Sequence, residues 1–429
     1  MKRIKVGVLG AYRGSSMINY CAVANNAEVV AICDKWEKGL AIQKELHKDL
    51  PITYYNNFEE FIKHDMDAVV LANYANEHAP FAIKAMKQGK HVFSEVLPVQ
   101  TMKEAVELIE AVEETGMTYA YGENYCYIAG PYEMKRLYEE GAVGEFEYAE
   151  CEYIHNGEPI WPNISYGDPN HWRNNMYSTF YCTHSVGPII HITGLRPTSV
   201  IGFESNHNHR NDRIGKKGAQ FGIEMVTLEN GGLVKSIHGS LYKDSHWYCL
   251  YGSKGRIETA RQDSTPARFQ QVYVNLDDFD GQYKWDVKSY LPERDMDDKC
   301  KHFGHGGSDF YSMYHFIEKL LGNPNADIID IYEALDMSLP GMFAYRSILA
   351  GSIPMDIPNL RNKDEREKWR EDVTCTDKNV AGNMLLPTRK GGTPEIPDAV
   401  YEKIRNKWEA EQHAEGGYTQ QAFKQGSGK

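Results

Sequence analysis

A phenol and an imidazole three positions apart, Tyr181 and His184, form a pair that could move protons. If this segment is helical, the two side chains lie on one face and can share a site. Histidine titrates near neutral pH and a tyrosine hydroxyl can donate or accept a proton, so the pair suits general acid–base catalysis. Taken alone, a buried and hydrogen-bonded core residue is the better explanation of this histidine.

A second candidate site begins where the first apolar segment, 4–9, ends. The next residues, 10–16, read Gly-Ala-Tyr-Arg-Gly-Ser-Ser and lead into a helix. Glycine lets the backbone approach a pyrophosphate, and a helix start offers free N–H groups to its charge. Tyr12 and Ser15 stand where Gly-x-Gly-x-x-Gly has its second and third glycines, so a plain strand–helix turn explains the loop equally well on its own.

An acidic residue at the end of the next strand favours a dinucleotide at this loop. Asp34 stands 20 positions after Gly14, where a carboxylate accepts hydrogen bonds from the adenosine ribose. The same carboxylate would repel the 2′-phosphate of NADP, so NAD is the predicted cofactor. We expect its binding site to include Gly10, Tyr12, Arg13, Gly14 and Asp34.

Short apolar strands alternate with amphipathic helices over the first 122 residues. Strands are predicted at 4–9, 28–33, 68–72, 91–94 and 118–120, and helices at 38–47, 77–88 and 102–114. This alternation predicts a parallel sheet with helices on both faces. The fold class is therefore α/β, with a Rossmann domain, a doubly wound parallel sheet, over residues 1–122.

Longer strands and fewer helices follow from residue 123 onward. Strands are predicted at 145–155, 198–204, 221–228, 233–242, 247–252 and 270–274, and helices at 132–140, 309–321 and 332–351. This pattern predicts an α+β domain with a large, mostly antiparallel open sheet over residues 123–360. Residues 361–429, with one helix at 399–412, are predicted to form a C-terminal extension that wraps the body or joins a neighbouring subunit.

The composition of the chain argues against some classes of binding partner and favours one cellular compartment. A formal charge of −13 argues against nucleic acid and anionic membranes. No apolar run is long enough to span a bilayer, and no secretory leader is recognised. The eight scattered cysteines form no Cys-x-x-Cys pair, which favours reduced thiols and a cytoplasmic location. His302, His305 and Asp309 lack a full ligand set, so no metal is predicted.

Three further segments resemble the glucose-fructose oxidoreductase / inositol dehydrogenase / MocA (Gfo/Idh/MocA) family. Residues 69–78 contain Val-Val-Leu-Ala-Asn and then Asn-Glu-His, residues 85–92 read Ala-Met-Lys-Gln-Gly-Lys-His-Val, and residues 141–145 read Gly-Ala-Val-Gly-Glu. The resemblance implies the same two-domain fold. It adds four residues to the expected cofactor contacts: Asn73, His78, Glu95 and Asn124.

One departure concerns the lysine of this family's usual Glu-Lys-Pro motif, which lies near the reacting carbinol. Here residues 95–98 read Glu-Val-Leu-Pro, so another group must take the hydroxyl proton. Residues 122–127, 152–155, 172–173, 181–188 and 305–310 resemble the NAD-dependent glycoside hydrolase branch of the family, typified by alpha-N-acetylgalactosaminidase. That branch implies a catalytic cluster of Glu123, Tyr153, Tyr181 and His184.

The reaction that this resemblance implies is a redox-neutral hydrolysis with NAD as a bound catalyst. C3 of the sugar is transiently oxidised while Tyr181 or His184 takes the hydroxyl proton, and Tyr153 removes the acidified C2 proton. The C1 substituent is then eliminated, water adds and C3 is reduced again. Sugar contacts are expected from His155, Trp172 and Arg173. Structural roles explain Tyr153, Glu123 and Trp172 about equally well.

Two other interpretations stay open. The chain could be an ordinary NAD-dependent dehydrogenase of a sugar, inositol or amino-sugar, or a catalytically silent NAD-binding sensor. The missing lysine favours the hydrolase over the dehydrogenase, and the retained catalytic cluster argues against the sensor. In each enzymatic case the partner is a small carbohydrate. The open sheet needs cover, which predicts a homo-oligomer, a dimer or tetramer.

Overall fold

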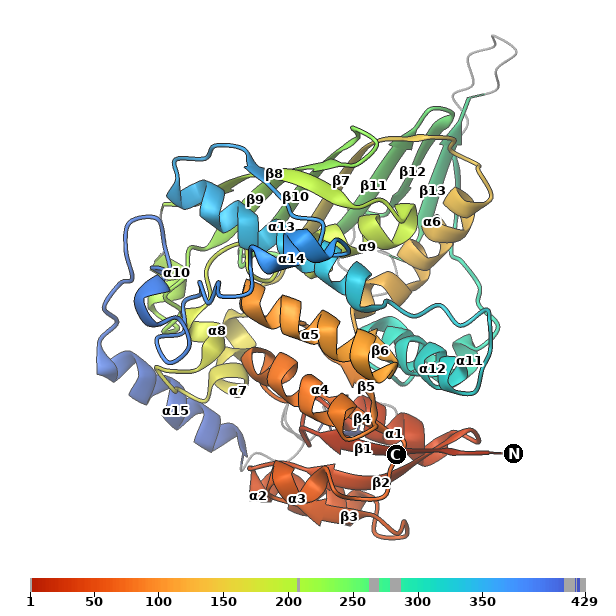
Figure 1. The fold of residues 1–429 in the computed structure, drawn as a ribbon, viewed down its shortest axis with the longest axis vertical. Helices are drawn as coiled ribbons and strands as arrows, with labels where there is room; N and C mark the ends of the chain where they lie inside the picture. The colour runs from red at the N-terminus through yellow and green to blue at the C-terminus, as the bar shows by residue number, and fades with distance from the viewer. Residues whose placement is uncertain are drawn as a thin grey trace.

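Two β-sheets, separated by a layer of helices, organise the chain (Figure 1). The computed structural model describes residues 2–206, 209–261, 270–277, 287–412, 421 and 423–424. The N-terminal sheet lies at the bottom of Figure 1 and the second, larger sheet at the top.

The N-terminal sheet is parallel throughout and has the strand order β3-β2-β1-β4-β5-β6. This order is that of a Rossmann domain, as predicted. The central strand β4 reads Ala-Val-Val-Leu and is buried on both faces, as a parallel strand between helices must be. The strands are β1 (Ile4–Leu9), β2 (Ala27–Cys33), β3 (Thr53–Tyr55), β4 (Ala68–Leu71), β5 (His91–Ser94) and β6 (Tyr119–Tyr121), and the helices are α1 (Ser15–Val23), α2 (Glu37–Leu46), α3 (Phe58–Phe61), α4 (His78–Lys87) and α5 (Met102–Thr115).

The second sheet has nine strands in the order β14-β13-β12-β11-β7-β10-β9-β8-β15. Only β7 and β10 pair in parallel, so the prediction of a mostly antiparallel sheet is confirmed. The predicted strand at 233–242 ends at Gly239, where φ is +155°. The strands are β7 (Phe146–Ile154), β8 (Pro197–Glu204), β9 (Phe221–Leu228), β10 (Leu233–Gly239), β11 (Ser245–Gly252), β12 (Gly255–Thr259), β13 (Val272–Leu276), β14 (Lys288–Tyr290) and β15 (Met355–Asp356).

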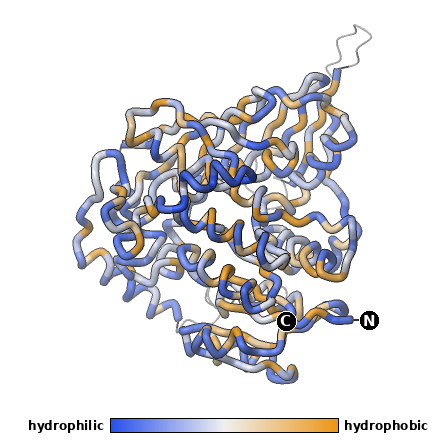
Figure 2. Tube along the Cα trace, viewed as in Figure 1, coloured by the Kyte–Doolittle hydropathy of each residue, from blue (hydrophilic) through white to orange (hydrophobic). Residues whose placement is uncertain are grey.

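Helices cover one face of this second sheet. Helix α9 packs on β7 and β10, α13 packs on β8, and α13 also reaches α5 of the Rossmann domain (Figure 1). Buried and partly exposed residues alternate along β9 and β10, and apolar and polar residues alternate along the strands in Figure 2. The remaining helices are α6 (Ala129–Glu139), α7 (Trp161–Ser165), α8 (Trp172–Asn175), α9 (Thr183–Thr193), α10 (His209–Asp212), α11 (Asp297–Cys300), α12 (Ser308–Leu320), α13 (Ile331–Leu349), α14 (Lys363–Glu367) and α15 (Asp398–Gln412).

The C-terminal part of the chain packs back onto its own body. Helix α15 contacts α7, and the Trp408 ring lies 5.2 Å from that of Tyr166. Farther along, Phe423 is buried, with its ring 5.6 Å from Tyr12 and 6.0 Å from Trp36. The described part of the extension therefore reaches the glycine turn after β1.

Two further observations concern the helices and the thiols. Among the described residues, no helix has the length and apolar character that crossing a bilayer requires. All eight cysteines are buried and free.

A buried charge cluster joins α9 to α13 and should make stability depend on pH. His191 Nδ1 lies 2.6 Å from Glu333, and its Nε2 lies 3.3 Å from Asp327, which also binds Lys135. Burial alone would lower the pKa of His191, but Glu333 and Asp327 outweigh it and raise the pKa to about 9. The charged imidazole thus stabilises the fold fully below about pH 6.5, and this contribution is lost as the pH rises through 9.

We therefore expect the free energy of unfolding to fall between pH 6 and pH 10, by up to about 3 kcal/mol from this group. Urea unfolding at both pH values measures it. The variant His191→Gln should lose most of this pH dependence, whereas the exposed His302→Gln should keep it. An equal fall in wild type and His191→Gln would contradict the assignment.

Candidate active site

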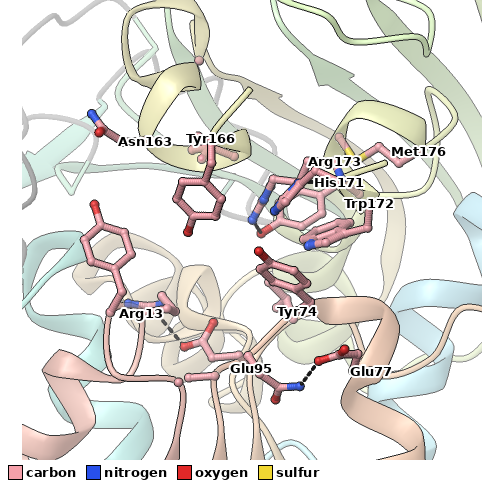
Figure 3. A pocket seen from close by; sticks show the side chains of 18 of the residues that line it. Arg13, Tyr74, Glu77, Glu95, Asn163, Tyr166, His171, Trp172, Arg173 and Met176 are labelled. Carbon is pink, nitrogen blue, oxygen red and sulfur yellow. Dashed lines mark hydrogen bonds and ion pairs between the residues drawn. The ribbon is translucent and has the colours of Figure 1, made fainter. Parts of the chain in front are cut away.

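A cavity of about 890 Å³ lies between the two sheets and is lined by residues of both domains (Figure 3). On the Rossmann side its walls begin where β1, β2, β4 and β5 end, at Gly10, Asp34, Asn73 and Glu95. The carboxyl ends of parallel strands are where this fold binds dinucleotides. The cavity therefore lies where the sequence predicts the cofactor.

The glycine turn after β1 has the backbone that a dinucleotide loop needs. Gly10 has φ of +105°, and a Cβ there would lie 2.4 Å from the Ala72 carbonyl oxygen. A Cβ on Gly14 would lie 2.3 Å from the Gly10 carbonyl oxygen, so this glycine permits close packing of α1 on β1. Gly14 is not among the cavity-lining residues, and its role is to shape the turn.

Asp34 is fixed by backbone groups at the end of β2. Its carboxylate accepts hydrogen bonds from the N–H groups of Ala11 at 2.7 Å and Trp36 at 2.8 Å. Burial raises the pKa of Asp34, and these two bonds oppose the rise. The carboxylate thus ties the glycine turn to β2 and lines the cavity where a ribose would lie. This arrangement fits NAD.

Arg13 joins the turn to the second domain. Its guanidinium binds Glu95 at 2.6 Å and Asp309 of α12 at 2.9 Å, and Asn124 donates to Asp309 at 3.0 Å. Burial would raise the pKa of Asp309, but Arg13 and His305 hold it well below the usual range. Arg13, Glu95 and Asn124, predicted as cofactor contacts, line the cavity; Arg13 pairs directly with Glu95, and Arg13 and Asn124 both bind Asp309.

Two predicted residues of the loop after β4 differ in position. Asn73 lines the cavity and donates to Glu77 at 3.1 Å. His78 is buried outside the lining, with Nδ1 2.9 Å from the Leu97 carbonyl and Nε2 3.3 Å from the Asn73 carbonyl. Burial lowers its pKa to about 4, so the ring is neutral and donates one hydrogen bond, to one of these two carbonyls. His78 is therefore not placed to contact the cofactor directly.

The second domain contributes the residues that the sequence analysis predicts to be catalytic. His184 lies in the first turn of α9, and its Nδ1 is 2.6 Å from a carboxylate oxygen of Glu123, which is fully buried. Because Nδ1 is held by the carboxylate, Nε2 is the nitrogen left to exchange a proton with a ligand. His184 lines the cavity, whereas Glu123 does not and lies behind it.

Two phenols accompany this histidine. Their rings lie 4.7 Å (Tyr153) and 4.9 Å (Tyr181) from the His184 ring. Arg173, on α8, donates to Tyr181 Oη at 3.2 Å. Burial raises the pKa of both phenols, and at Tyr181 this hydrogen bond opposes the rise. Of the two phenols, Tyr181 is therefore the one whose ionised form would have a hydrogen-bonded cation beside it.

The predicted sugar contacts also line the cavity. Arg173 lies between two rings, 4.5 Å from Trp172 and 4.7 Å from Tyr181, and His155 lies at the end of β7. At the position of the family lysine, Val96 lines the wall with an apolar side chain.

Several residues of the site escaped the sequence analysis. Tyr125 packs on His184 at 4.6 Å, His246 lies 5.3 Å from Tyr153, and Tyr74 enters from the Rossmann side. Asp309 was weighed as a metal ligand and lay in the segment 305–310 that resembles the hydrolase branch, but its pairing with Arg13 was not predicted. Among the described residues, no group of three or more His, Cys, Asp or Glu side chains could hold a metal ion.

The position of Asp34 leads to a prediction about cofactor affinity. Removing its carboxylate in Asp34→Ala leaves two backbone N–H groups and the ribose hydroxyls without an acceptor. We expect the dissociation constant for NAD to rise about 10- to 100-fold, measured by calorimetry, with weaker discrimination against NADP. The exposed Asp49→Ala should leave both unchanged. An unaltered NAD affinity in Asp34→Ala would contradict the assignment.

Comparison with known proteins agrees with this geometry. Residues 4–123 match the Gfo/Idh/MocA family model, described as an oxidoreductase family with an NAD-binding Rossmann fold. A glycosyl hydrolase family 109 protein of Solibacter usitatus is 26% identical over 403 residues, 86% of this chain and 89% of that protein. An alpha-N-acetylgalactosaminidase of Tannerella forsythia is 26% identical over 414 residues, 83% and 86% of the two chains.

Solved structures share the fold. The scyllo-inositol dehydrogenase of Lactobacillus casei, with bound NAD(H) and scyllo-inositol, has a TM-score of 0.63 at 16% identity and covers 83% of this chain and 99% of its own. The WlbA dehydrogenase of Bordetella pertussis, with NADH and UDP-GlcNAcA, has a TM-score of 0.64 at 17% identity over 83% and 98%. This chain is an enzyme whose cofactor is NAD; its residues 4–123 match the Gfo/Idh/MocA family model, and over more than four fifths of its length it is similar to proteins named glycosyl hydrolase family 109.

Proposed function

We propose that this enzyme is an NAD-dependent glycoside hydrolase whose overall reaction is redox-neutral. The observation that carries the proposal is the convergence of His184, Tyr153 and Tyr181 on one cavity that also contains the cofactor loop, with Val96 in place of the family lysine. The relatives named glycosyl hydrolase family 109 support the same conclusion.

Bound NAD supplies reversible oxidation at C3 of the sugar. The loop 10–14 and Asp34 would hold it, next to Arg13, Asn73, Glu95 and Asn124.

His184 is the proposed acceptor of the C3 hydroxyl proton. Its Nδ1 donates to Glu123, and its Nε2 takes the proton from the sugar. The carboxylate of Glu123 fixes the ring orientation and stabilises the imidazolium that forms, as a buried orienting carboxylate does in other catalytic clusters.

A carbonyl at C3 makes the neighbouring C2 proton acidic, so a phenolate can remove it. We assign this step to Tyr181, because Arg173 donates to its oxygen and stabilises the ionised form. This differs from the role that the resemblance implies for Tyr153. Burial raises the pKa of Tyr153 too, and among the described residues Arg173 donates to Tyr181 and not to Tyr153, so we assign Tyr153 the protonated role of hydrogen-bonding to the sugar or to the leaving oxygen. Loss of the C2 proton expels the C1 substituent, and water then adds at C1.

The experiment is a panel of α- and β-aryl glycosides, with aglycone release and NADH absorbance followed together. Aglycone release over many turnovers without NADH accumulation, lost when NAD is stripped and restored by its addition, is the expected result. NADH accumulation with the glycosidic bond intact would instead establish an NAD-dependent dehydrogenase of a sugar, inositol or amino-sugar. Binding of NAD with no turnover of any glycoside or polyol would support a sensor.

We also propose a cytoplasmic homo-oligomer. The eight free cysteines are compatible with a reducing compartment. The second sheet exposes apolar side chains, Phe203 on β8, Leu233 on β10 and Tyr251 on β11, that a second subunit would cover. Light scattering should give the mass of a dimer or tetramer, and a monodisperse monomer would contradict this proposal.

A further inference from the structure

The cavity contains a buried lysine without a counter-ion in the described part of the chain. Lys216, in the loop after α10, is 6% exposed and lines the cavity. Its ammonium group makes no hydrogen bond or ion pair with any residue that the structure describes. It lies 5.5 Å from the centre of the Trp161 ring. A buried charge in this situation is costly unless a ligand or water pairs with it.

The surroundings make the Lys216 end of the cavity positive. Burial and the nearby Arg173 together lower the pKa of Lys216 to about 8, and no described carboxylate opposes this shift. The ammonium is therefore still largely protonated at neutral pH. Two cationic side chains, Lys216 and Arg173, thus face one part of the cavity.

Lys216 lies at the sugar end of the cavity. Arg173, whose charge lowers the pKa of Lys216, also donates a hydrogen bond to Tyr181. Besides burial, Lys216 lowers the pKa of His238, and His238 is the register neighbour of Tyr153 on the adjacent strand. The glycine turn that would hold the pyrophosphate of NAD lies in the other domain.

Uncharged polar groups line the same cavity as the lysine. Asn163 on α7, two positions after Trp161, is buried, and its Oδ1 has no hydrogen-bond partner among the described residues. Ser178, Gln220 and Ser240 also line the cavity. Such groups suit sugar hydroxyls, and a cation among them suits one negative group on the same molecule.

We propose that Lys216 binds an anionic group of the substrate, so that the glycosides cleaved here carry a carboxylate or a sulfate or phosphate ester. The glycoside part of this inference rests on the proposed function, whereas the anionic part rests on Lys216. An anion forms a charge-assisted hydrogen bond with the ammonium in a site that excludes water. A neutral sugar leaves the lysine unpaired, so the same residue discriminates against neutral glycosides.

The test measures binding rather than turnover, so it does not depend on the hydrolase assignment. The NAD-loaded full chain is titrated by calorimetry at pH 7 with D-glucuronate, D-galacturonate, and the 6-phosphates and 6-sulfates of glucose and galactose. Glucose and galactose are the neutral comparison. We expect one acidic class to bind about 10- to 100-fold more tightly than its neutral counterpart. Which class binds tells a carboxylate site from an ester site.

Three variants assign that difference to the lysine. Lys216→Met should abolish the preference for the acidic sugar, and Lys216→Arg should keep part of it. The adjacent Lys217→Met is the matched control, because the Lys217 ammonium already binds the Pro169 carbonyl and the Asn175 side chain. Thermal melting verifies that each variant is folded.

Four outcomes would overturn the proposal. In the first two, the wild type binds no acidic sugar more tightly than its neutral counterpart, or Lys216→Met keeps the full preference for the acidic sugar. In the other two, Lys217→Met loses that preference as completely as Lys216→Met does, or Lys216→Met binds NAD tenfold more weakly. The last would assign the lysine to the cofactor. If Lys216-dependent binding is found but no glycoside is hydrolysed, the proposed function fails and the anionic ligand class stands. If neutral glycosides alone are hydrolysed, the proposed function stands and the anionic ligand class fails.

Discussion

His184→Ala is expected to lower kcat on the best glycoside by about a thousand-fold, because it removes the imidazole that accepts the C3 hydroxyl proton. NAD should bind as before, since the cofactor loop and Asp34 belong to the other domain. Steady-state aglycone release and a calorimetric NAD titration on the same preparation measure the two effects.

The variants Tyr181→Phe and Tyr153→Phe test which of the two phenols removes the C2 proton. Tyr181→Phe should lower kcat about as much as His184→Ala, because it removes the phenolate that takes the C2 proton. Tyr153→Phe should cost less, about tenfold to a hundredfold, the loss of one hydrogen bond to the sugar or leaving group. Near-normal turnover in Tyr181→Phe or His184→Ala would show that the catalytic assignment is wrong. If kcat falls further in Tyr153→Phe than in Tyr181→Phe, Tyr153 and not Tyr181 is the base that removes the C2 proton.

The second large effect is expected from Glu123→Gln, which keeps the side chain's shape and removes its charge. The carboxylate accepts from His184 Nδ1 at 2.6 Å and from the Tyr125 N–H at 3.2 Å. Without it the imidazole loses the partner that fixes its orientation and stabilises its charged form. We expect kcat to fall about a hundredfold with KM little changed, since Glu123 does not line the cavity.

A kinetic split separates this positioning role from a structural one. If Glu123 only supported the fold, Glu123→Gln would lower the melting temperature and raise KM along with any loss of kcat. The exposed Glu147→Gln is the control and should change neither constant. Unchanged kcat in a folded Glu123→Gln would contradict the positioning role.

Local sequence signals were enough to locate the cofactor half of the cavity. Gly10 and Gly14 are required by steric contacts that any dinucleotide turn shares, and Asp34 follows from the length of one strand–helix–strand unit. The short β3 and α3 were missed, because three- and four-residue elements carry no measurable periodicity. The three-residue edge strand β14 escaped for the same reason.

The sugar half of the cavity depends on contacts between distant segments. Asp309 reaches Arg13 across 296 positions, and Glu123 meets His184 across 61. Residue type alone did not distinguish Lys216 from the other lysines, because its importance comes from burial without a partner. His78 shows the converse, since a motif placed it near the cofactor and the structure turns it between two backbone carbonyls.

The most direct test of the proposed chemistry is the deuterium content of the released sugar after complete hydrolysis in D₂O. Elimination breaks the C2–H bond, and C2 takes up a solvent proton when water adds, so the account predicts one deuterium at C2 in each product molecule. Hydrolysis by two carboxylates never breaks that bond. A fully hydrolysed product with no deuterium at C2 would therefore contradict the mechanism.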